Sequence, residues 1–201
     1  MVQNAEFDVV IYGASGFTGR LVAEYMTGKY GDGEVSWAMA GRSLEKLAQV
    51  RDEIGATAET PLITADASDR ASLAAMAERA KVIITTVGPY TLYGEPLVKA
   101  CVEAGTDYVD LSGEVLFMRD MIDQYEDVAK KSGARIVFSC GFDSIPFDLG
   151  VQFLEEEAVK RFGAPLPRVR GRVRGLAGGL SGGTAASGAA TVGASTVLAC
   201  V

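Results

Sequence analysis

The stretch Gly13–Arg20 reads GASGFTGR and directly follows the apolar run Phe7–Tyr12 (FDVVIY). An apolar run rich in Val and Ile is typical of a buried parallel strand, and the residues after the glycines have helical spacing. A turn of this kind needs glycine for the tight bend, for close approach of a pyrophosphate and for close packing of helix on strand. We assign these three roles to Gly13, Gly16 and Gly19 in that order. The helix N-terminus would then present N–H groups to the phosphates.

The alternation of strands and helices continues to about residue 161. After a first strand at 7–12 and helix at 16–29, the sequence predicts strands at 35–40, 61–64, 81–87, 108–111 and 135–140, and helices at 43–54, 68–80, 94–104, 114–131 and 145–161. This order predicts an α/β fold, a doubly wound parallel-sheet Rossmann domain with helices on both faces. The glycine turn then lies on the first strand–helix connection, which is the context that a dinucleotide-binding turn requires.

The sequence changes character after residue 162. Residues 164–167 (APLP) resemble a domain boundary, residues 168–174 (RVRGRVR) alternate with the period of a half-exposed strand, and residues 175–193 are dense in Gly, Ala, Ser and Thr. We therefore expect a dinucleotide-binding Rossmann domain over residues 1–163. Residues 164–201 are expected to be the truncated start of a second α+β domain.

Composition excludes several classes of function. The formal net charge of -7 argues against a nucleic-acid partner, which would need a basic face. The absence of histidine removes Ser-His catalysis and His-ligated zinc, and we expect no metal site. Three widely spaced cysteines favour a reducing compartment. The sequence shows neither a signal pattern nor a transmembrane segment, so we expect a cytoplasmic protein, with peripheral membrane contact left open.

The end of the second predicted strand indicates which dinucleotide is bound. NAD-binding Rossmann domains usually place Asp or Glu there to hold the ribose 2′-hydroxyl, but residues 37–43 read WAMAGRS and contain no acid. The guanidinium of Arg42 can pair with a 2′-phosphate, and the hydroxyl of Ser43 can add a hydrogen bond. The alternative is that Arg42 forms only a surface salt bridge. The sequence therefore favours NADP(H) over NAD(H).

Residues 85–90 (TTVGPY) end the fourth predicted strand. In a doubly wound sheet the crevice between the first and fourth strands is the ligand cleft. Gly88 would let the chain pass near a cofactor and Pro89 would stiffen the loop, although an ordinary turn remains an alternative. Asp66, after the third strand, could contact adenine or cap the next helix, and we favour the cap.

Two acidic segments also follow predicted strands: residues 110–114 (DLSGE) and 140–148 (CGFDSIPFD). Ligands bind outside strand carboxyl ends in such sheets, so these acids could belong to a substrate pocket. Glu114 and Asp143 also stand just before predicted helices, where carboxylates are favoured as caps. For each of the two residues we favour the cap.

Six motifs occur in order along the chain: GASGFTGR, AGRS, VGPYTLYGEPLVKAC, GTDYVDLSGE, CGFDSIPFDLG and SGGTAAS. Together, from Asp8 to about Ser187, they resemble the saccharopine dehydrogenase-like oxidoreductases, in the branch of trans-acting enoyl reductases. The resemblance implies a nicotinamide-dependent oxidoreductase that reduces a C=C bond of a lipid-type intermediate, some members having membrane or glycolipid links. With the residues after the second strand, the expected function is that of an NADP(H)-dependent oxidoreductase. The resemblance also implies a second domain that binds the small-molecule substrate and forms a homodimer in the full-length protein.

Carried onto this sequence, the resemblance gives cofactor-binding residues at Gly13, Ser15, Gly16, Phe17, Thr18, Gly19, Arg42, Ser43, Val87, Gly88 and Pro89. Val87 to Tyr90 would lie next to the nicotinamide half. The catalytic residue stays unknown, with Tyr90, Asp143 or a bound water as the proton donor. Two alternatives remain: an amino-acid oxidoreductase resembling saccharopine reductase, and a non-catalytic NADP(H)-binding scaffold or sensor.

Overall fold

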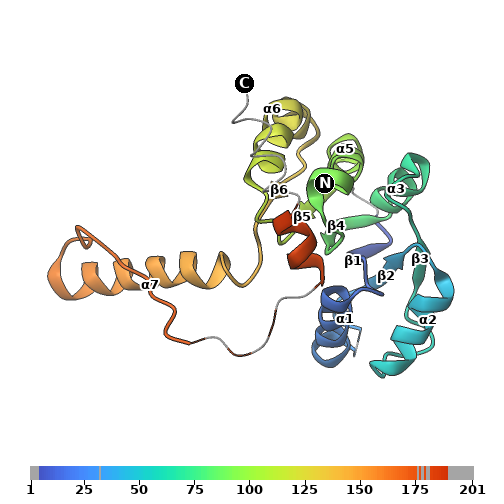
Figure 1. Ribbon diagram of the computed structural model, residues 1–201, viewed down its shortest axis with the longest axis horizontal. Coiled ribbons are helices and arrows are strands. Elements are labelled where there is room, and N and C mark those ends of the chain that lie inside the picture. The colour runs from blue at the N-terminus through green and yellow to red at the C-terminus, as the bar shows by residue number, and fades with distance from the viewer. Residues whose placement is uncertain (1–4, 32, 176, 178, 180–181, 190–201) are drawn as a thin grey trace.

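The computed structural model describes residues 5–31, 33–175, 177, 179 and 182–189. At its centre is a parallel sheet in the order β3-β2-β1-β4-β5-β6 (Figure 1). The strands are β1 (Phe7–Tyr12), β2 (Trp37–Gly41), β3 (Leu62–Thr64), β4 (Ala80–Thr85), β5 (Asp107–Val109) and β6 (Ile136–Val137). The predicted doubly wound Rossmann sheet is confirmed. Its strand order reverses between β1 and β4, which is where such sheets bind ligands.

Helices alternate with these strands. They are α1 (Phe17–Tyr30), α2 (Leu44–Glu53), α3 (Arg70–Ala77), α4 (Tyr90–Tyr93), α5 (Glu95–Ala104), α6 (Val115–Ser132) and α7 (Ile145–Phe162). Residues 182–189 also form a helix. The short helix α4 was not predicted from the sequence. None of the described helices is long and apolar enough to cross a membrane.

The hydrophobic core lies on both faces of the sheet. Successive side chains of a strand point to opposite faces, so Val10 and Ile11 of β1 enter different clusters. Ile11 packs with Leu47 of α2 and with side chains of α1. Val10 shares its cluster with Leu97 of α5 and with side chains of α3 and α6. This two-sided burial explains why the strands read as continuous apolar runs rather than as alternating ones.

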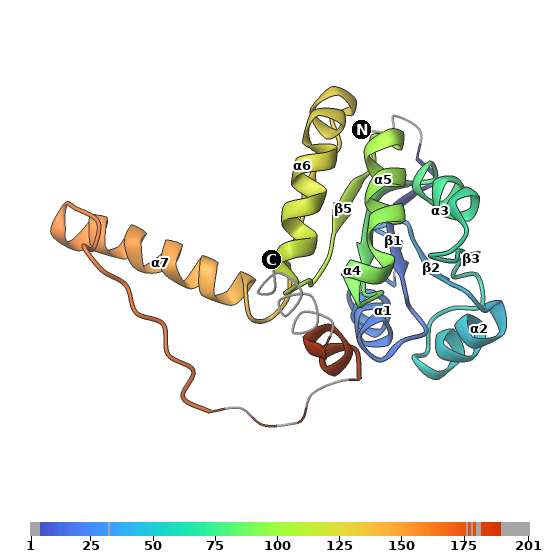
Figure 2. The ribbon, with the colours of Figure 1, turned by 45° about the horizontal axis from the view of Figure 1, so that its top comes forward.

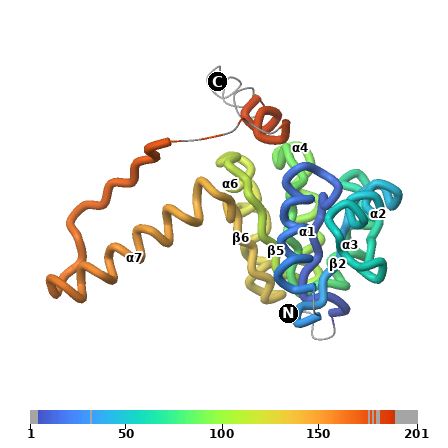
Figure 3. The backbone as a smooth tube through the Cα atoms, turned by 90° about the horizontal axis from the view of Figure 1, so that it is seen from below, coloured from blue at the N-terminus to red at the C-terminus, as the bar shows by residue number. Residues whose placement is uncertain are grey.

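Helix α7 extends away from the sheet, as Figure 2 shows. It ends at Gly163, whose left-handed backbone (φ 74°) is typical of a helix C-terminus. The strand predicted at 168–174 is wrong, because these residues form no regular secondary structure. Their arginines are exposed, and an extended segment becomes a strand only where a neighbouring strand accepts its hydrogen bonds. The helix of residues 182–189 lies near α4 (Figure 3). The domain division at 163/164 stays a prediction.

Candidate dinucleotide-binding site

The glycine-rich turn is anchored to the second strand by backbone hydrogen bonds. The N–H groups of Gly13 and Ala14 donate to the carbonyl oxygen of Ala40, at 2.9 and 3.1 Å. Gly13 has a φ of 89°, a left-handed conformation that side chains disfavour. The N–H of Gly16 then donates to the carbonyl of Gly13 at 2.9 Å, which closes the turn before α1.

The three glycines of the turn differ in what a β-carbon would meet. At Gly13 it would lie 2.8 Å from Thr86 Oγ1 and from a methyl of Val87. At Gly19 it would lie 2.1 Å from the carbonyl oxygen of Gly13. At Gly16 the nearest neighbour is the Gly13 oxygen at 3.2 Å, and no other atom lies within 4 Å. Gly13 and Gly19 therefore keep the turn packed, whereas Gly16 leaves space that a phosphate can use.

Helix α1 begins beside this space without a side-chain cap. Its N-cap residue is Gly16, which forms no side-chain capping bond, and its first turn holds no acidic residue. The first N–H groups of a helix lack intrahelical partners and carry the positive end of the helix dipole. This helix start suits an anion, so the residues present fit the pyrophosphate of a dinucleotide.

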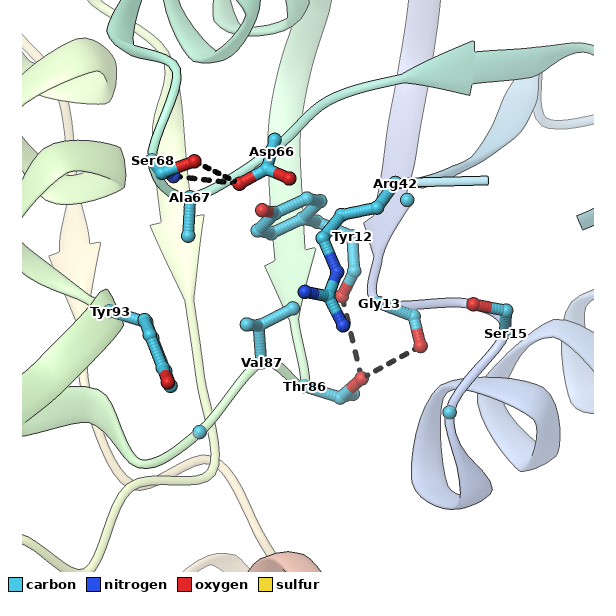
Figure 4. A pocket seen from close by; sticks show the side chains of 13 residues that line it. Tyr12, Gly13, Ser15, Arg42, Asp66, Ala67, Ser68, Thr86, Val87 and Tyr93 are labelled. Carbon is cyan, nitrogen blue, oxygen red and sulfur yellow. Dashed lines mark hydrogen bonds between the residues drawn. The ribbon is translucent and has the colours of Figure 1, made fainter. Parts of the chain in front are cut away.

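A cleft of about 420 Å³ opens above the carboxyl ends of β1 and β4, and Figure 4 shows its lining. Among the residues that the structure describes, it is lined by Tyr12, Gly13, Ser15, Gly16, Gly41, Arg42, Asp66, Ala67, Ser68, Thr86, Val87, Gly88 and Tyr93. The cleft thus brings together the glycine turn, the end of β2 and the loop after β4. Of the predicted cofactor-binding residues, Gly13, Ser15, Gly16, Arg42, Val87 and Gly88 line it. Phe17, Thr18, Gly19, Ser43 and Pro89 lie beside it in sequence and are outside this lining.

Arg42 gives one end of the cleft a positive charge. Its side chain is exposed, and within the described part of the chain it has no hydrogen bond or ion pair. The surface salt bridge considered as the alternative is therefore not formed with any described residue. In Figure 4 the guanidinium is drawn below the ring of Tyr12, on the side of Thr86, whereas Asp66 lies on the other side of that ring. Tyr93 is drawn at the far side of the cleft. The N–H groups of Arg42, which no described residue accepts, can donate two parallel hydrogen bonds to a phosphate.

Asp66 lines the same cleft as Arg42 and does not cap the following helix. The cap of α3 is Asp69, whose carboxylate accepts from the N–H groups of Ala71 and Ser72. The expectation that Asp66 is the cap is wrong. Asp66 instead accepts from the N–H and the hydroxyl of Ser68, at 2.8 and 2.7 Å, and these bonds lower the pKa of its carboxyl. The carboxylate thus stays at the cleft, on a short turn of its own.

Ser43 is the N-cap of α2. Its hydroxyl accepts from the N–H of Lys46 at 3.3 Å. Its further role as a cofactor ligand stays a prediction.

The loop after β4 forms the opposite end of the cleft. The hydroxyl of Thr86 reaches the carbonyl oxygens of Tyr12 and Gly13, at 3.4 Å each, and so connects this loop to the glycine turn. Val87 and Gly88 then line the cleft. Pro89 is the N-cap residue of α4.

The two candidate proton donors lie elsewhere. Tyr90 is buried, and its hydroxyl donates to the carbonyl of Thr85 at 3.2 Å while its ring packs near Phe117. Burial, together with the charge of Asp110, raises the pKa of the Tyr90 phenol. Asp143 is exposed and does not line the cleft. The predicted cap role of Asp143 is not found either, since the N-cap of α7 is Ser144.

Glu114 is the N-cap residue of α6, but its side chain does not cap that helix. The carboxylate turns to α4, where it accepts from the N–H groups of Tyr90 and Thr91 at 2.9 and 2.8 Å. The prediction that the Glu114 side chain caps α6 is therefore wrong, because the carboxylate binds the first N–H groups of α4 instead. This contact could not be predicted from the sequence, because α4 itself was not expected.

Sequence reasoning missed several residues of the cleft, among them Tyr12 and Tyr93. Tyr12 is the last residue of β1, and burial raises the pKa of its phenol to about 12. The carboxyl end of the first strand borders the ligand crevice in this fold, and this position could have identified Tyr12. Tyr93 depends on α4, which has no clear sequence pattern.

Residues 9–137 match the family model described as the saccharopine dehydrogenase NADP binding domain. A Mycobacterium tuberculosis protein whose name provisionally assigns it as a trans-acting enoyl reductase is 55% identical over 154 residues, which are 76% of this chain and 36% of that protein. The trans-acting enoyl reductase of Mycobacterium ulcerans is 53% identical over 156 residues, 77% of this chain and 37% of its own. The chain thus spans little more than a third of the length of these curated relatives.

Among solved structures, the apo saccharopine dehydrogenase (L-Glu forming) from Saccharomyces cerevisiae superposes with a TM-score of 0.61. The two chains share 23% identity, and the match covers 78% of this chain and 32% of the yeast chain. This likeness supports the fold. Because the family model spans more than half of the sequence, including the glycine turn and Arg42, the chain belongs to the family of saccharopine dehydrogenase NADP-binding domains.

Proposed function

We propose that this chain binds NADP(H) in preference to NAD(H) and forms the cofactor-binding part of an oxidoreductase that reduces a C=C bond of a lipid-type intermediate. The observation that supports the cofactor preference is Arg42, which lines the cleft and forms no hydrogen bond or ion pair with a described residue, although its charge helps to lower the pKa of Asp66. No acid stands at the end of β2 to hold a free ribose 2′-hydroxyl. The names of the relatives support the reaction class.

Each part of the cleft has a separate task in this proposal. The N–H groups at the start of α1 and the space at Gly16 hold the pyrophosphate. Arg42 pairs with the 2′-phosphate, and Val87 and Gly88 lie against the nicotinamide half. When bound, the nicotinamide supplies the hydride, while the protein orients it and excludes water.

The proton that completes the reduction has no protein donor among the two candidates. The hydroxyl of Tyr90 is occupied by the carbonyl of Thr85, and Asp143 is exposed away from the cleft. We therefore propose bound water as the proton source. The homodimer of a full-length protein, the cytoplasmic location and the peripheral membrane contact stay predictions.

The test measures binding and turnover separately. Calorimetry of the 201-residue chain with NADPH and with NADH gives the preference, and equal affinities would refute it. NADPH oxidation is then followed with an enoyl thioester and, in parallel, with a 2-oxo acid plus an amine. The M. ulcerans relative serves as comparison for the enoyl assay. Turnover only with the 2-oxo acid and amine would favour an amino-acid oxidoreductase. Binding without turnover in the chain and in a version extended to its relatives' length would favour a scaffold or sensor.

A further inference from the structure

A buried carboxylate lies at the Gly88 end of the cleft. Glu114 is 2% exposed, and its oxygens accept from the N–H of Tyr90 at 2.9 Å, the N–H of Thr91 at 2.8 Å and the hydroxyl of Thr91 at 2.5 Å. These donors belong to the first turn of α4, which directly follows Gly88 and Pro89. The carboxylate thus fixes the start of the segment that forms this end of the cleft.

The same carboxylate is bonded by a residue that lies far along the chain. The hydroxyl of Ser187, in the helix of residues 182–189, donates to Glu114. The Ser187 oxygen lies 3.3 Å from the position that a β-carbon on Gly88 would occupy. In Figures 2 and 3 this helix, drawn in dark red, lies close to the sheet although α7 and the residues after it lead the chain away.

The contact is stronger than a neutral hydrogen bond. Burial alone would raise the pKa of Glu114, but the hydrogen bonds from Thr91, Tyr90 and Ser187 outweigh it and lower the pKa. Glu114 is therefore ionised near neutral pH. Hydrogen bonds to an ionised group are shorter and about twice as strong as neutral ones. Within residues 182–189, Ser187 is half-buried whereas the others are exposed.

We propose that Glu114 is a positioning residue that holds the helix of residues 182–189 over the Gly88 end of the cleft and thereby sets the affinity for the nicotinamide half of the cofactor. This inference rests on the proposed function, in which Val87 and Gly88 lie against that half. A helix held there reduces the solvent access of a bound nicotinamide. Release of the helix leaves the Arg42 end unchanged, because Arg42 lies at the other end of the cleft.

The test compares two ligands that differ only in the nicotinamide. NADPH and 2′-phospho-ADP-ribose are titrated calorimetrically into the 201-residue chain and into the variants Glu114→Gln and Ser187→Ala. We expect each variant to bind NADPH roughly three- to thirtyfold more weakly, as loss of a charge-assisted hydrogen bond implies. Binding of 2′-phospho-ADP-ribose should change less than about twofold. Amide hydrogen exchange in residues 182–189 should become faster in both variants.

Matched controls lie on α6. Ser132→Ala removes a half-buried serine that bonds only backbone groups near the end of α6, and Glu126→Gln removes an exposed carboxylate paired with Lys130. Both should bind the two ligands like the unmutated chain. If Glu114→Gln does not fold, Ser187→Ala carries the test, because its side chain contributes no core packing.

Three outcomes overturn the inference: equal weakening of the two ligands, unchanged NADPH affinity in Ser187→Ala, or unchanged exchange in residues 182–189. Failure of the proposed function is distinguishable, since the unmutated chain would then bind neither ligand. The exchange measurement without ligand still tests the contact between Glu114 and Ser187 in that case.

Discussion

The carbonyl oxygen of Gly13 lies 2.1 Å from the position that a β-carbon at Gly19 would occupy, so α1 and the turn before it are in backbone contact. Real β-carbons stay beyond about 3 Å from such atoms, and both partners here belong to the main chain. A side chain at residue 19 would therefore move the helix away from β1. Gly16, three residues earlier, is less constrained, because a β-carbon there would lie 3.2 Å from the same oxygen and would need a shift of only a few tenths of an ångström. We therefore expect a side chain at residue 19 to disturb mainly the fold, and a side chain at residue 16 to disturb mainly ligand binding.

We predict that Gly19→Ala destabilises the chain by about 1–3 kcal/mol or more, because an added methyl group in a tightly packed place forces backbone shifts. Urea unfolding followed by circular dichroism measures this loss. An unfolding free energy equal to that of the unmutated chain would contradict this prediction, because the backbone would then accommodate the methyl group without loss of stability.

We predict the opposite pattern for Gly16→Val. Its branched side chain occupies the space that we assign to the pyrophosphate, so NADPH binding should fall below detection. The unfolding free energy should fall by no more than about 1 kcal/mol, the usual cost of a poor N-cap. Near-normal NADPH affinity in this variant would place the phosphates elsewhere.

We predict that Arg42→Ala narrows the preference for NADPH over NADH by roughly 1.5–3 kcal/mol, the loss of a charge-assisted hydrogen bond. Calorimetry with both dinucleotides measures it. The control is Arg20→Ala, which removes an arginine of the first turn of α1 that is already paired with Glu53 at 2.6 Å. An equal loss of preference in the control would indicate a general effect of positive charge rather than a specific contact.

The ion pair between the buried Asp107 and the exposed Arg135 gives a pH-dependent prediction. The Asp107 side chain is 8% exposed, and burial would raise its pKa, but the side-chain and backbone hydrogen bonds from Arg135 lower it. A carboxyl with a lowered pKa stabilises the fold above its unfolded pKa of about 3.9, and this contribution is lost as the pH falls through the folded value.

We predict that Arg135→Ala destabilises the chain by about 1–3 kcal/mol at pH 7, because a buried carboxylate loses its ionic partner. The difference from the unmutated chain should shrink below about pH 4, where protonation removes the charge. Urea unfolding between pH 3 and pH 7 checks this. Arg119→Ala, which breaks an exposed pair with Asp123, should cost less than about 0.5 kcal/mol at every pH. If the difference in unfolding free energy between Arg135→Ala and the unmutated chain were the same at every pH, the destabilisation would not come from the charge of Asp107.

Much of the fold could be predicted from sequence because the signal is local. The run Phe7–Tyr12 matches β1 residue for residue, and the strands predicted between residues 35 and 140 overlap those observed. The predicted strand at 168–174 failed because a strand depends on a partner that the pattern itself cannot supply. Helix α4 was missed because one short turn leaves no periodicity.

In the candidate site, too, local features could be predicted from sequence, whereas tertiary contacts could not. Gly13, Gly16 and Arg42 were identified because backbone freedom and charge are readable from residue type. The roles of Asp66 and Glu114 were predicted wrongly. A carboxylate just before a helix resembles a cap in the sequence, even where in the structure it accepts hydrogen bonds from other groups. Asp69, three residues after Asp66, caps α3, and Glu114 reaches a helix that comes earlier in the chain. Which donor a carboxylate binds thus depends on distances in the folded structure rather than on the spacing of residues in the sequence.

The bond between Glu114 and Ser187 also bears on recombination among relatives. A crossover between two parent genes at codon 163 looks harmless, because it leaves the whole sheet with one parent. It would nevertheless inherit the carboxylate from one parent and the hydroxyl from the other. Chimeras with a junction after residue 189 keep the carboxylate and the hydroxyl from the same parent.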